Sequence, residues 1–176
     1  GDPAVLSVSD GEGRVAGSST MQRLDTTLGS QTAVNSDVVA RYTSKDYGND
    51  TGRLMVRFSG KSTYYAAGLD SAQGSPVIDI VRDGGIGESE VASVAYDATS
   101  ATSYWERVQV QNSGNSSTIA VRVWPDGTPE PATWNLTYVD ASPLAAGSAG
   151  VQVRDGGEGW AMDNFSAASL SAQDKS

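Results

Sequence analysis

The chain has 176 residues, and its 21 acidic side chains against 12 basic ones give a formal net charge of −9 at pH 7. This balance argues against nucleic acid as a partner, because binding a phosphate backbone requires Lys and Arg to displace counterions. Histidine and cysteine are both absent, which removes the commonest general base, the commonest zinc ligand and any disulfide. No run of about 18 apolar residues occurs, so we expect no insertion into a membrane.

Alternation of apolar and polar residues predicts β-strands along the whole chain, and no window has the apolar spacing and caps of a helix. The first residues, Gly1-Asp2-Pro3, have no signal-peptide character, as in a mature secreted chain or an excised domain. In chain order, the predicted strands cover residues 4–8, 12–16, 20–28, 35–44, 53–59, 63–70, 76–82, 89–95, 104–111, 117–124, 133–140, 148–154 and 160–170.

Turn-forming residues separate these segments, as at Asp83-Gly84-Gly85 and Asp126-Gly127. About a dozen short strands at this spacing, with no helices between them, predict an all-β fold: a two-sheet antiparallel β-sandwich. A chain of this length fits one domain. We expect that domain to cover residues 1–170, followed by a C-terminal tail at 171–176.

The alternation also assigns side chains to the two faces of the predicted sheets. The valines of segments 104–111 and 117–124 share one face of each strand, and we expect them to meet in the core. The intervening positions then face outward. The side chains expected on outer faces include Arg57, Arg107, Arg122 and Trp124.

An outward-facing set of arginine, glutamine and aromatic side chains is the predicted ligand site. Sugars stack on aromatic rings and hydrogen-bond to planar polar groups, and guanidinium groups also hold a uronate or sulfate bidentately. A solvated sheet face, on which Arg and Gln pair with Asp or Glu, explains the same pattern and is the alternative. The predicted ligand-binding residues are Arg57, Tyr65, Trp105, Arg107, Gln109, Arg122, Trp124 and Trp160.

Core packing is the competing explanation for each of the aromatic residues. Trp160 follows the glycine-rich segment 156–159 and is the tryptophan most expected at a binding rim. Tyr64 and Tyr65 are consecutive on one predicted strand, so one of them should face outward, where it could stack on a sugar.

The segment from Trp124 to Trp134 reads WPDGTPEPATW, and VDASPLAAGSAGVQV and AMDNFSAASL follow it. Over roughly the last 70 residues the sequence resembles the concanavalin-A-like jelly rolls of the laminin-G-like and glucanase superfamily. The resemblance implies a concanavalin-A-like jelly roll that presents a sugar-sized face rather than a catalytic cavity. Similar WPDGTPEP domains are appended to actinobacterial glycan-degrading enzymes and to tail proteins of phages that infect actinobacteria.

The same resemblance implies a structural Ca²⁺ as cofactor, with Asp163 of Met162-Asp163-Asn164-Phe165 as a metal ligand. Ca²⁺ takes six to eight oxygen ligands, and Asp163 alone does not supply them. The usual partners lie on an N-terminal strand of the form D-x-F-x-R…W-G, which does not occur in this chain. Asp163 is therefore the single metal ligand that we can name.

Patterns for catalysis are weak in this sequence. Retaining glucanases of this fold use Glu-x-Asp-x-x-Glu to place two carboxylates about 5 Å apart, and neither Glu88-Ser89-Glu90 nor Asp155 with Glu158 has that spacing. Related lyases use a His and a Tyr, so a lyase here would depend on Tyr65 near Arg107. The sequence therefore favours binding without turnover.

The expected function is a non-catalytic carbohydrate-binding or adhesion module of a larger extracellular or virion protein. Its expected partners are a polysaccharide or cell-surface glycan, an acidic one if the arginines hold it, and other domains of the parent protein. Three alternatives stay open: a phage-tail structural or host-surface-binding domain, a polysaccharide lyase or glycoside hydrolase, and a structural spacer.

Overall fold

The computed structural model describes residues 5–9, 12–16, 22–71, 74–155 and 160–171, with side chains described from residue 32 onward except at 155. Thirteen strands run through this part of the chain and no helix occurs in it, so the predicted all-β fold is confirmed. None of the described residues therefore forms a helix that could cross a bilayer. The predicted domain limits, 1–170 and 171–176, stay a prediction, and residues 172–176 lie outside the described part.

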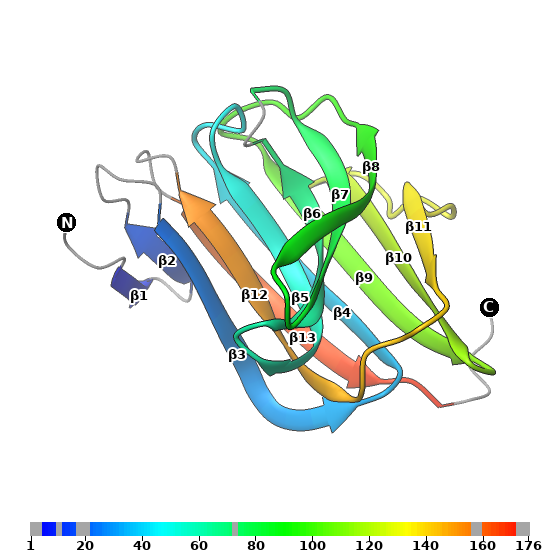
Figure 1. Ribbon diagram of the computed structural model, residues 1–176. Coiled ribbons are helices and arrows are strands. Elements are labelled where there is room, and N and C mark those ends of the chain that lie inside the picture. The colour runs from blue at the N-terminus through cyan, green and yellow to red at the C-terminus, as the bar shows by residue number, and fades with distance from the viewer. Residues whose placement is uncertain (1–4, 10–11, 17–21, 72–73, 156–159, 172–176) are drawn as a thin grey trace.

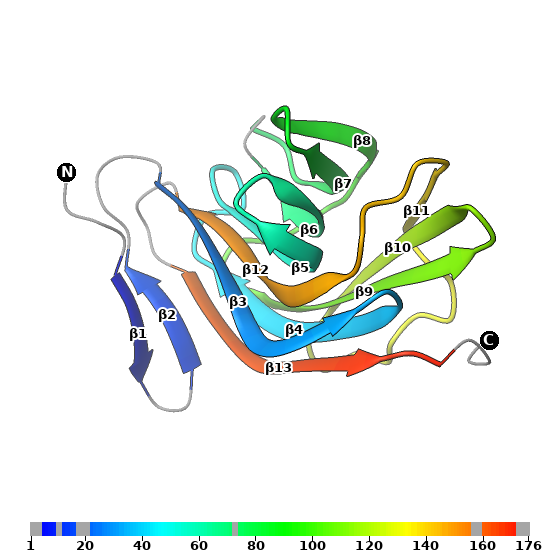
Figure 2. The ribbon, with the colours of Figure 1, turned by 60° about the horizontal axis from the view of Figure 1, so that its bottom comes forward.

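Two antiparallel sheets pack face to face, which is the β-sandwich expected from the sequence (Figures 1 and 2). The seven-stranded sheet consists, in spatial order, of β1 (Val5–Ser9), β2 (Glu12–Ala16), β13 (Trp160–Ser169), β4 (Ser36–Ser44), β9 (Ser103–Ser113), β10 (Ser116–Pro125) and β11 (Leu136–Asp140). The six-stranded sheet consists of β3 (Gln22–Ala33), β12 (Gly147–Asp155), β5 (Thr51–Gly60), β6 (Thr63–Asp70), β7 (Val77–Gly84) and β8 (Glu88–Ala95).

The last two strands of the chain return to the interior of the sheets. Strand β12 pairs with both β3 and β5, and β13 pairs with both β2 and β4. Figure 2 shows the orange β12 beside the blue β3, with the red β13 next to β4 in the other layer. The closing segments are therefore integral to both sheets rather than appended to an edge.

Each predicted strand has an observed counterpart, and two of the predicted boundaries differ from the observed ones by three or more residues. Strand β3 continues to Ala33, and β11 begins at Leu136 rather than at 133. At the start of β11, the Asn135 N–H donates to Val121 O at 3.0 Å, and its side-chain oxygen accepts from Val123 N at 2.9 Å. Asn135 thus fixes the end of the preceding loop against β10.

The core lies between the sheets and contains the valines that the alternation assigned to it. Val108, Val110, Ile119 and Val121 of the seven-stranded sheet are fully buried. They belong to one apolar cluster with residues of the six-stranded sheet, among them Leu54, Val56, Ile78, Ile80 and Val151. Both layers therefore contribute to a single core.

The central strands of the six-stranded sheet are buried on both of their faces. Seven of the eight residues of β6 are buried, Thr63 being the exception, and so are the first seven residues of β5. On the side away from the main core, Met55, Tyr64 and Val81 belong to a second apolar cluster. A strand with two buried faces does not leave alternate positions for solvent, so alternation cannot assign outward side chains here.

A β-bulge also changes the register of β5. Pairing with β6 is irregular between Val56 and Gly60, and Arg57 has a left-handed backbone with φ 53°. The bulge rotates the Arg57 side chain away from the outer face on which simple alternation places it. The predicted outward orientation of Arg57 is therefore wrong.

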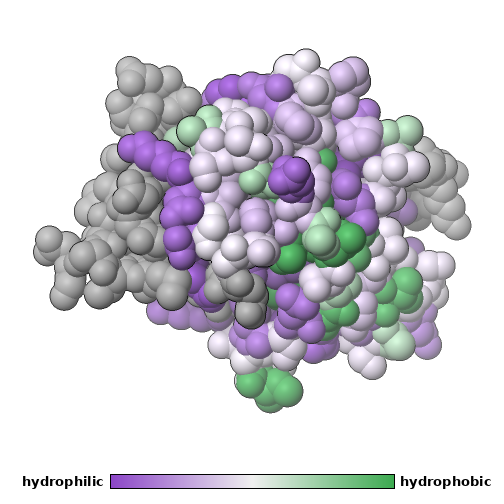
Figure 3. All heavy atoms as spheres, turned by 90° about the horizontal axis from the view of Figure 1, so that it is seen from above, coloured by the Kyte–Doolittle hydropathy of each residue, from purple (hydrophilic) through white to green (hydrophobic). Residues whose placement is uncertain are grey.

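Large apolar side chains are seldom exposed among the described residues. The exceptions are Val34, Ile86, Val94 and Val139, of which Ile86 is 97% exposed. Seen from above, the described surface is mostly hydrophilic or neutral, with apolar groups small and separate (Figure 3). A binding surface on this protein would therefore consist of mixed aromatic and polar side chains.

Candidate functional site

Strands β9 and β10 place the strongest part of the predicted ligand site on the outer face of the seven-stranded sheet. Trp105 pairs with Trp124 and Arg107 pairs with Arg122 across the two strands. The two indole rings are nearly parallel, with centroids 6.2 Å apart and an interplanar angle of 12°. Strict alternation in β9, from buried Tyr104 to half-buried Gln111, puts Gln109 on the same face.

Strands β4 and β13 extend this face on the other side of β9. Arg41 is the register partner of both Trp105 and Asp163. Its guanidinium donates to the two carboxylate oxygens of Asp163 at 2.9 and 2.6 Å, and to Asp126 Oδ2 at 2.8 Å. These hydrogen bonds raise the pKa of Arg41 above its ordinary value, so the side chain stays charged.

The loop 125–135 folds back over the same face and supplies further partners. Trp105 Nε1 donates to Asp126 Oδ1 at 2.8 Å. Glu130 Oε1 lies 3.0 Å from Arg107 Nη1 and 3.1 Å from Arg122 Nη1. The loop therefore brings two carboxylates to a surface whose strands supply the arginines.

Arg122 is held on three sides by this loop. Its Nη1 donates to Pro131 O at 2.6 Å, and its guanidinium carbon lies 3.7 Å from the centroid of the Trp134 ring. A guanidinium over an indole face is a favourable cation–π arrangement. We use the name outer-face site for the set Asp37, Arg41, Trp105, Arg107, Gln109, Arg122, Trp124, Asp126, Glu130, Trp134 and Asp163.

The outer-face site is partly open to solvent, although Trp124 itself is only 8% exposed. The side chain of Arg107 is 30% exposed, that of Asp126 38% and that of Arg122 14%. The hydrogen bonds from Arg41 and Trp105 lower the pKa of the Asp126 carboxyl, which therefore remains ionised near neutral pH. Charged groups of both signs thus lie beside aromatic rings on the outer side of the seven-stranded sheet.

Three of the predicted ligand-binding residues are not in this site. Arg57, Tyr65 and Trp160 are 1%, 0% and 5% exposed. Tyr65 and Trp160 belong to the main core, where the Trp160 ring lies 5.7 Å from that of Tyr42. The rim position predicted for Trp160 is wrong; the 156–159 segment before it lies outside the described residues.

Arg57 and Tyr65 instead fasten connections to the six-stranded sheet. Arg57 donates to Val34 O at 2.9 Å, to Leu144 O at 2.8 Å and to Asn112 Oδ1 at 2.6 Å. The Tyr65 hydroxyl donates to Asp140 Oδ2 at 2.6 Å, and burial raises its pKa to about 12. Both residues therefore have structural partners rather than solvent.

The residue pair suggested for lyase chemistry is split between the two sheets. Tyr65 points from β6 into the core, whereas Arg107 lies on the outer face of the opposite sheet. Its neighbour Tyr64 is fully buried as well, so neither tyrosine has the outward position expected from alternation. Of the candidate acids, Glu88 accepts from Tyr64 Oη at 2.8 Å, and the side chains of Asp155 and Glu158 lie outside the described part.

Asp163 does not have the surroundings of a Ca²⁺ ligand in the described part of the chain. Both of its oxygens accept hydrogen bonds from Arg41, and the described residues contain no cluster of three or more acidic, His or Cys side chains suited to a metal. The guanidinium of Arg41 is a cation and offers no oxygen, so the surroundings of Asp163 do not supply the six to eight oxygen ligands of a Ca²⁺ site. The calcium site stays a prediction that would require ligands from residues whose side chains are not described.

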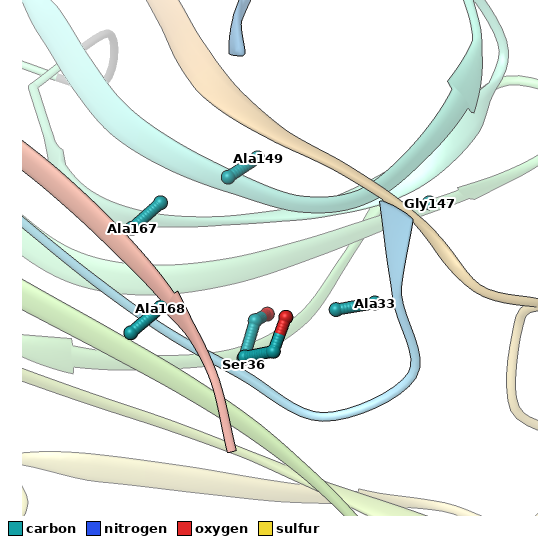
Figure 4. Close-up of a pocket in the computed structure, with 7 residues that line it drawn as sticks. Ala33, Ser36, Gly147, Ala149, Ala167 and Ala168 are labelled. Carbon is teal, nitrogen blue, oxygen red and sulfur yellow. The ribbon is translucent and has the colours of Figure 1, made fainter. Parts of the chain in front are cut away.

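A small pocket lies between β3, β4, β12 and β13 at one end of the sandwich (Figure 4). Small side chains line it, including Ala33, Ser36, Ala149 and Ala168. Its volume of about 30 Å³ is enough for a water molecule but not for a sugar ring. The pocket is therefore not a glycan site.

Five members of the outer-face site, namely Asp37, Arg41, Asp126, Glu130 and Trp134, were not among the predicted ligand-binding or metal-binding residues. Arg41 and Asp37 alternate with buried residues along β4, so the period of two in segment 35–44 is the signal that places them on the outer face. Asp126 and Glu130 lie in a loop without periodicity. No sequence pattern indicates that this loop folds onto its own sheet.

Comparison with known proteins identifies relatives of the fold only. No protein-family model matches the sequence, and no curated protein sequence matches it. The carbohydrate-binding module CBM66 from Bacillus subtilis is similar in structure, with a TM-score of 0.62 and 17% identity over 95% of this chain and 92% of that chain.

Two further structures share the fold. Xylan β-1,4-xylosidase from Bacillus halodurans C-125 has a TM-score of 0.56 and 10% identity; the match covers 89% of this chain and 32% of that chain. The globular domain of T. cruzi calreticulin has a TM-score of 0.55 and 12% identity, over 95% of this chain and 80% of that chain. The chain thus spans about a third of the xylosidase.

Proposed function

We propose that this chain is a carbohydrate-binding domain that recognises a polysaccharide on the outer-face site. The observation that carries the proposal is the outward row on β4, β9 and β10, where Trp105 lies beside Trp124 and between guanidinium–carboxylate pairs. An aromatic surface with fixed planar donors and acceptors around it matches how proteins hold sugar rings and hydroxyls.

The fold comparisons support the same proposal at a coarser level. One similar structure is named as a carbohydrate-binding module, and it matches this chain over nearly its whole length. Another is a xylosidase of which the matching part is about a third, so a domain of this fold does occur within a larger glycan-active protein. A concanavalin-A-like jelly roll within an extracellular or virion protein, as the WPDGTPEP segment implies, is part of the proposal.

We further propose that binding takes place without turnover. Tyr65 and Arg107, the pair on which a lyase would depend, lie on different sheets and on different faces. The four carboxylates of the outer-face site are all paired with arginines, whereas a general acid needs a carboxyl group that can hold a proton near neutral pH.

The proposal is tested by measuring binding of the chain to a panel of plant, bacterial and fungal polysaccharides by affinity electrophoresis and calorimetry. The W105A substitution should weaken binding about tenfold or more, which corresponds to about 1.4 kcal/mol. Because Trp105 stacks on Trp124, thermal unfolding must show that W105A is still folded, and Q109A provides a second, smaller truncation on the same face.

The matched control is I86A, which removes an exposed apolar side chain on the turn between β7 and β8 of the other sheet. I86A should bind as the wild-type protein does. Failure of the wild-type protein to bind any polysaccharide would refute the proposal, and so would equal binding by a folded W105A.

A further inference from the structure

We infer that the outer-face site selects uncharged glycans, and that Glu130 is the residue that enforces this selection. The inference rests on the proposed function, because it assigns the ligand class of the same site. It differs from the sequence-based expectation of an acidic glycan, because the arginines of this surface are paired with carboxylates.

The assembled outer-face site carries more negative than positive groups. Three guanidinium groups, those of Arg41, Arg107 and Arg122, face four carboxylates. The site therefore carries one net negative charge, within a chain whose formal net charge is −9. A uronate or sulfate group adds like charge to this surface, and a polymer of such groups meets repulsion from the whole chain.

The guanidinium groups of the site already have carboxylate partners within the protein. Arg41 lies between Asp163 and Asp126, 2.6 and 2.8 Å away. Arg107 lies between Asp37 at 3.5 Å and Glu130 at 3.0 Å. Bidentate recognition of an acidic sugar needs an accessible guanidinium edge. The Nε atoms of Arg107 and Arg122 have no hydrogen-bond partner but are buried, and Glu130 holds both Nη1 atoms. An acidic ligand would therefore compete with Glu130 for these arginines.

Uncharged hydroxyl groups meet no such obstacle. A hydroxyl both donates and accepts, so it can bridge a guanidinium N–H and a neighbouring carboxylate without breaking their pair. Both arginine contacts of Glu130 are made by its Oε1 atom, which leaves Oε2 as an acceptor for a sugar hydroxyl. Fixed pairs of opposite charge thus suit a neutral, polyhydroxylated ligand.

Glu130 has the largest influence on this selection because it neutralises two arginines at once. It lies in the exposed loop 125–135, with its side chain 29% exposed. An exposed ion pair contributes only about 0–1 kcal/mol to stability, so its removal should leave the fold intact. The E130Q substitution would make the site electrically neutral and free the facing edges of Arg107 and Arg122.

The test compares polysaccharides that share a backbone and differ in the charge of the group at C6. One pair is fully methyl-esterified homogalacturonan and polygalacturonate; the other is a neutral β-glucan and its C6-oxidised, uronate-containing form. These pairs are measured beside the general panel, with wild type, E130Q and D97N. Asp97 is exposed and lies outside the site, so D97N is a control for the same change in net charge.

We expect the wild-type protein to bind only neutral polysaccharides. Their affinity should change less than about twofold between about 50 and 500 mM NaCl, because an uncharged ligand has no net charge whose attraction to the site salt could screen. E130Q should gain at least about tenfold in affinity for the acidic members, and D97N should not. Thermal unfolding verifies that both variants are folded.

The outcomes separate the two levels of the proposal. Tighter binding of an acidic member by the wild-type protein would overturn the inference and leave the carbohydrate-binding function standing. A folded E130Q that gains nothing for acidic polymers would show that Glu130 does not set the selection. Absence of binding to every polysaccharide would overturn the proposed function, and this inference with it.

Discussion

Glu106 lies in the core between the sheets, and its replacement by glutamine gives a sharp test of the folded structure. The side chain is 1% exposed on the inward face of β9. Its Oε1 accepts a hydrogen bond from Leu69 N at 2.8 Å. No ion pair involves it among the described residues, although every arginine of the outer-face site has one.

Burial raises the pKa of the Glu106 carboxyl well above its ordinary 4.5, against the opposing effect of the Leu69 N–H. Between pH 4.5 and this raised pKa, the folded state holds a proton that the unfolded state has released. The free energy of unfolding therefore falls as the pH rises through this window, by about 1.4 kcal/mol for each pH unit.

The E106Q substitution retains a carbonyl oxygen for the Leu69 N–H and does not titrate. Compared with wild type, the free energy of unfolding of E106Q should thus rise by about 1.4 kcal/mol for each pH unit across the window. Any cost of fitting the amide into the core is the same at all pH values. The titration of Glu106 is therefore reported by how the difference in free energy of unfolding between E106Q and wild type changes with pH.

Urea unfolding followed by tryptophan fluorescence, at intervals from about pH 4 to about pH 7, measures this slope. D97N removes an exposed carboxylate and is measured beside E106Q as the surface control. If the difference between E106Q and wild type were also constant over this range, the carboxyl would be ionised in the folded protein and the reasoning refuted.

Two further predictions concern buried arginines. Arg53 donates to Asp79 Oδ1 at 2.8 Å and to Asp70 Oδ2 at 2.9 Å. R53M should therefore lower the free energy of unfolding by about 3–5 kcal/mol, because it leaves buried carboxylates uncompensated. A loss under about 1 kcal/mol, measured by urea unfolding, would contradict this. Arg57 hydrogen-bonds to three separate segments through one guanidinium. R57K keeps the charge but not the planar guanidinium, so it should lower the free energy of unfolding by on the order of 2–3 kcal/mol. An unchanged midpoint in calorimetric unfolding would contradict this prediction.

The strands and the main core could be predicted from the sequence because their signals are local. Alternation in β9 and β10 fixes which side chains point inward, and the pairing of Val108 with Val121 confirms it. The same alternation placed Trp105, Arg107 and Arg122 on one outer face. Where one face of a sheet is exposed to solvent and the other is buried, a period of two is sufficient to assign each side chain to its face.

Alternation fails where that condition does not hold. Tyr64 and Tyr65 are both buried because β6 is covered on both faces. Arg57 is buried because the bulge in β5 rotates it, and no residue pattern around it indicates a left-handed backbone. Trp160 is the first residue of β13 and pairs with Val15 of β2 and Ser44 of β4. This central position depends on contacts far away in the sequence.

The WPDGTPEP segment shows how one local turn determines the character of a distant surface. Gly127 takes φ 80°, Thr128 N donates to Pro125 O at 3.2 Å, and Asp126 N donates to Ser103 O at 2.9 Å. These contacts fix the loop to the end of β9 and bring Asp126 against Trp105. A segment that the sequence marks only as a turn therefore decides how much positive charge the arginines of this sheet can offer to a ligand.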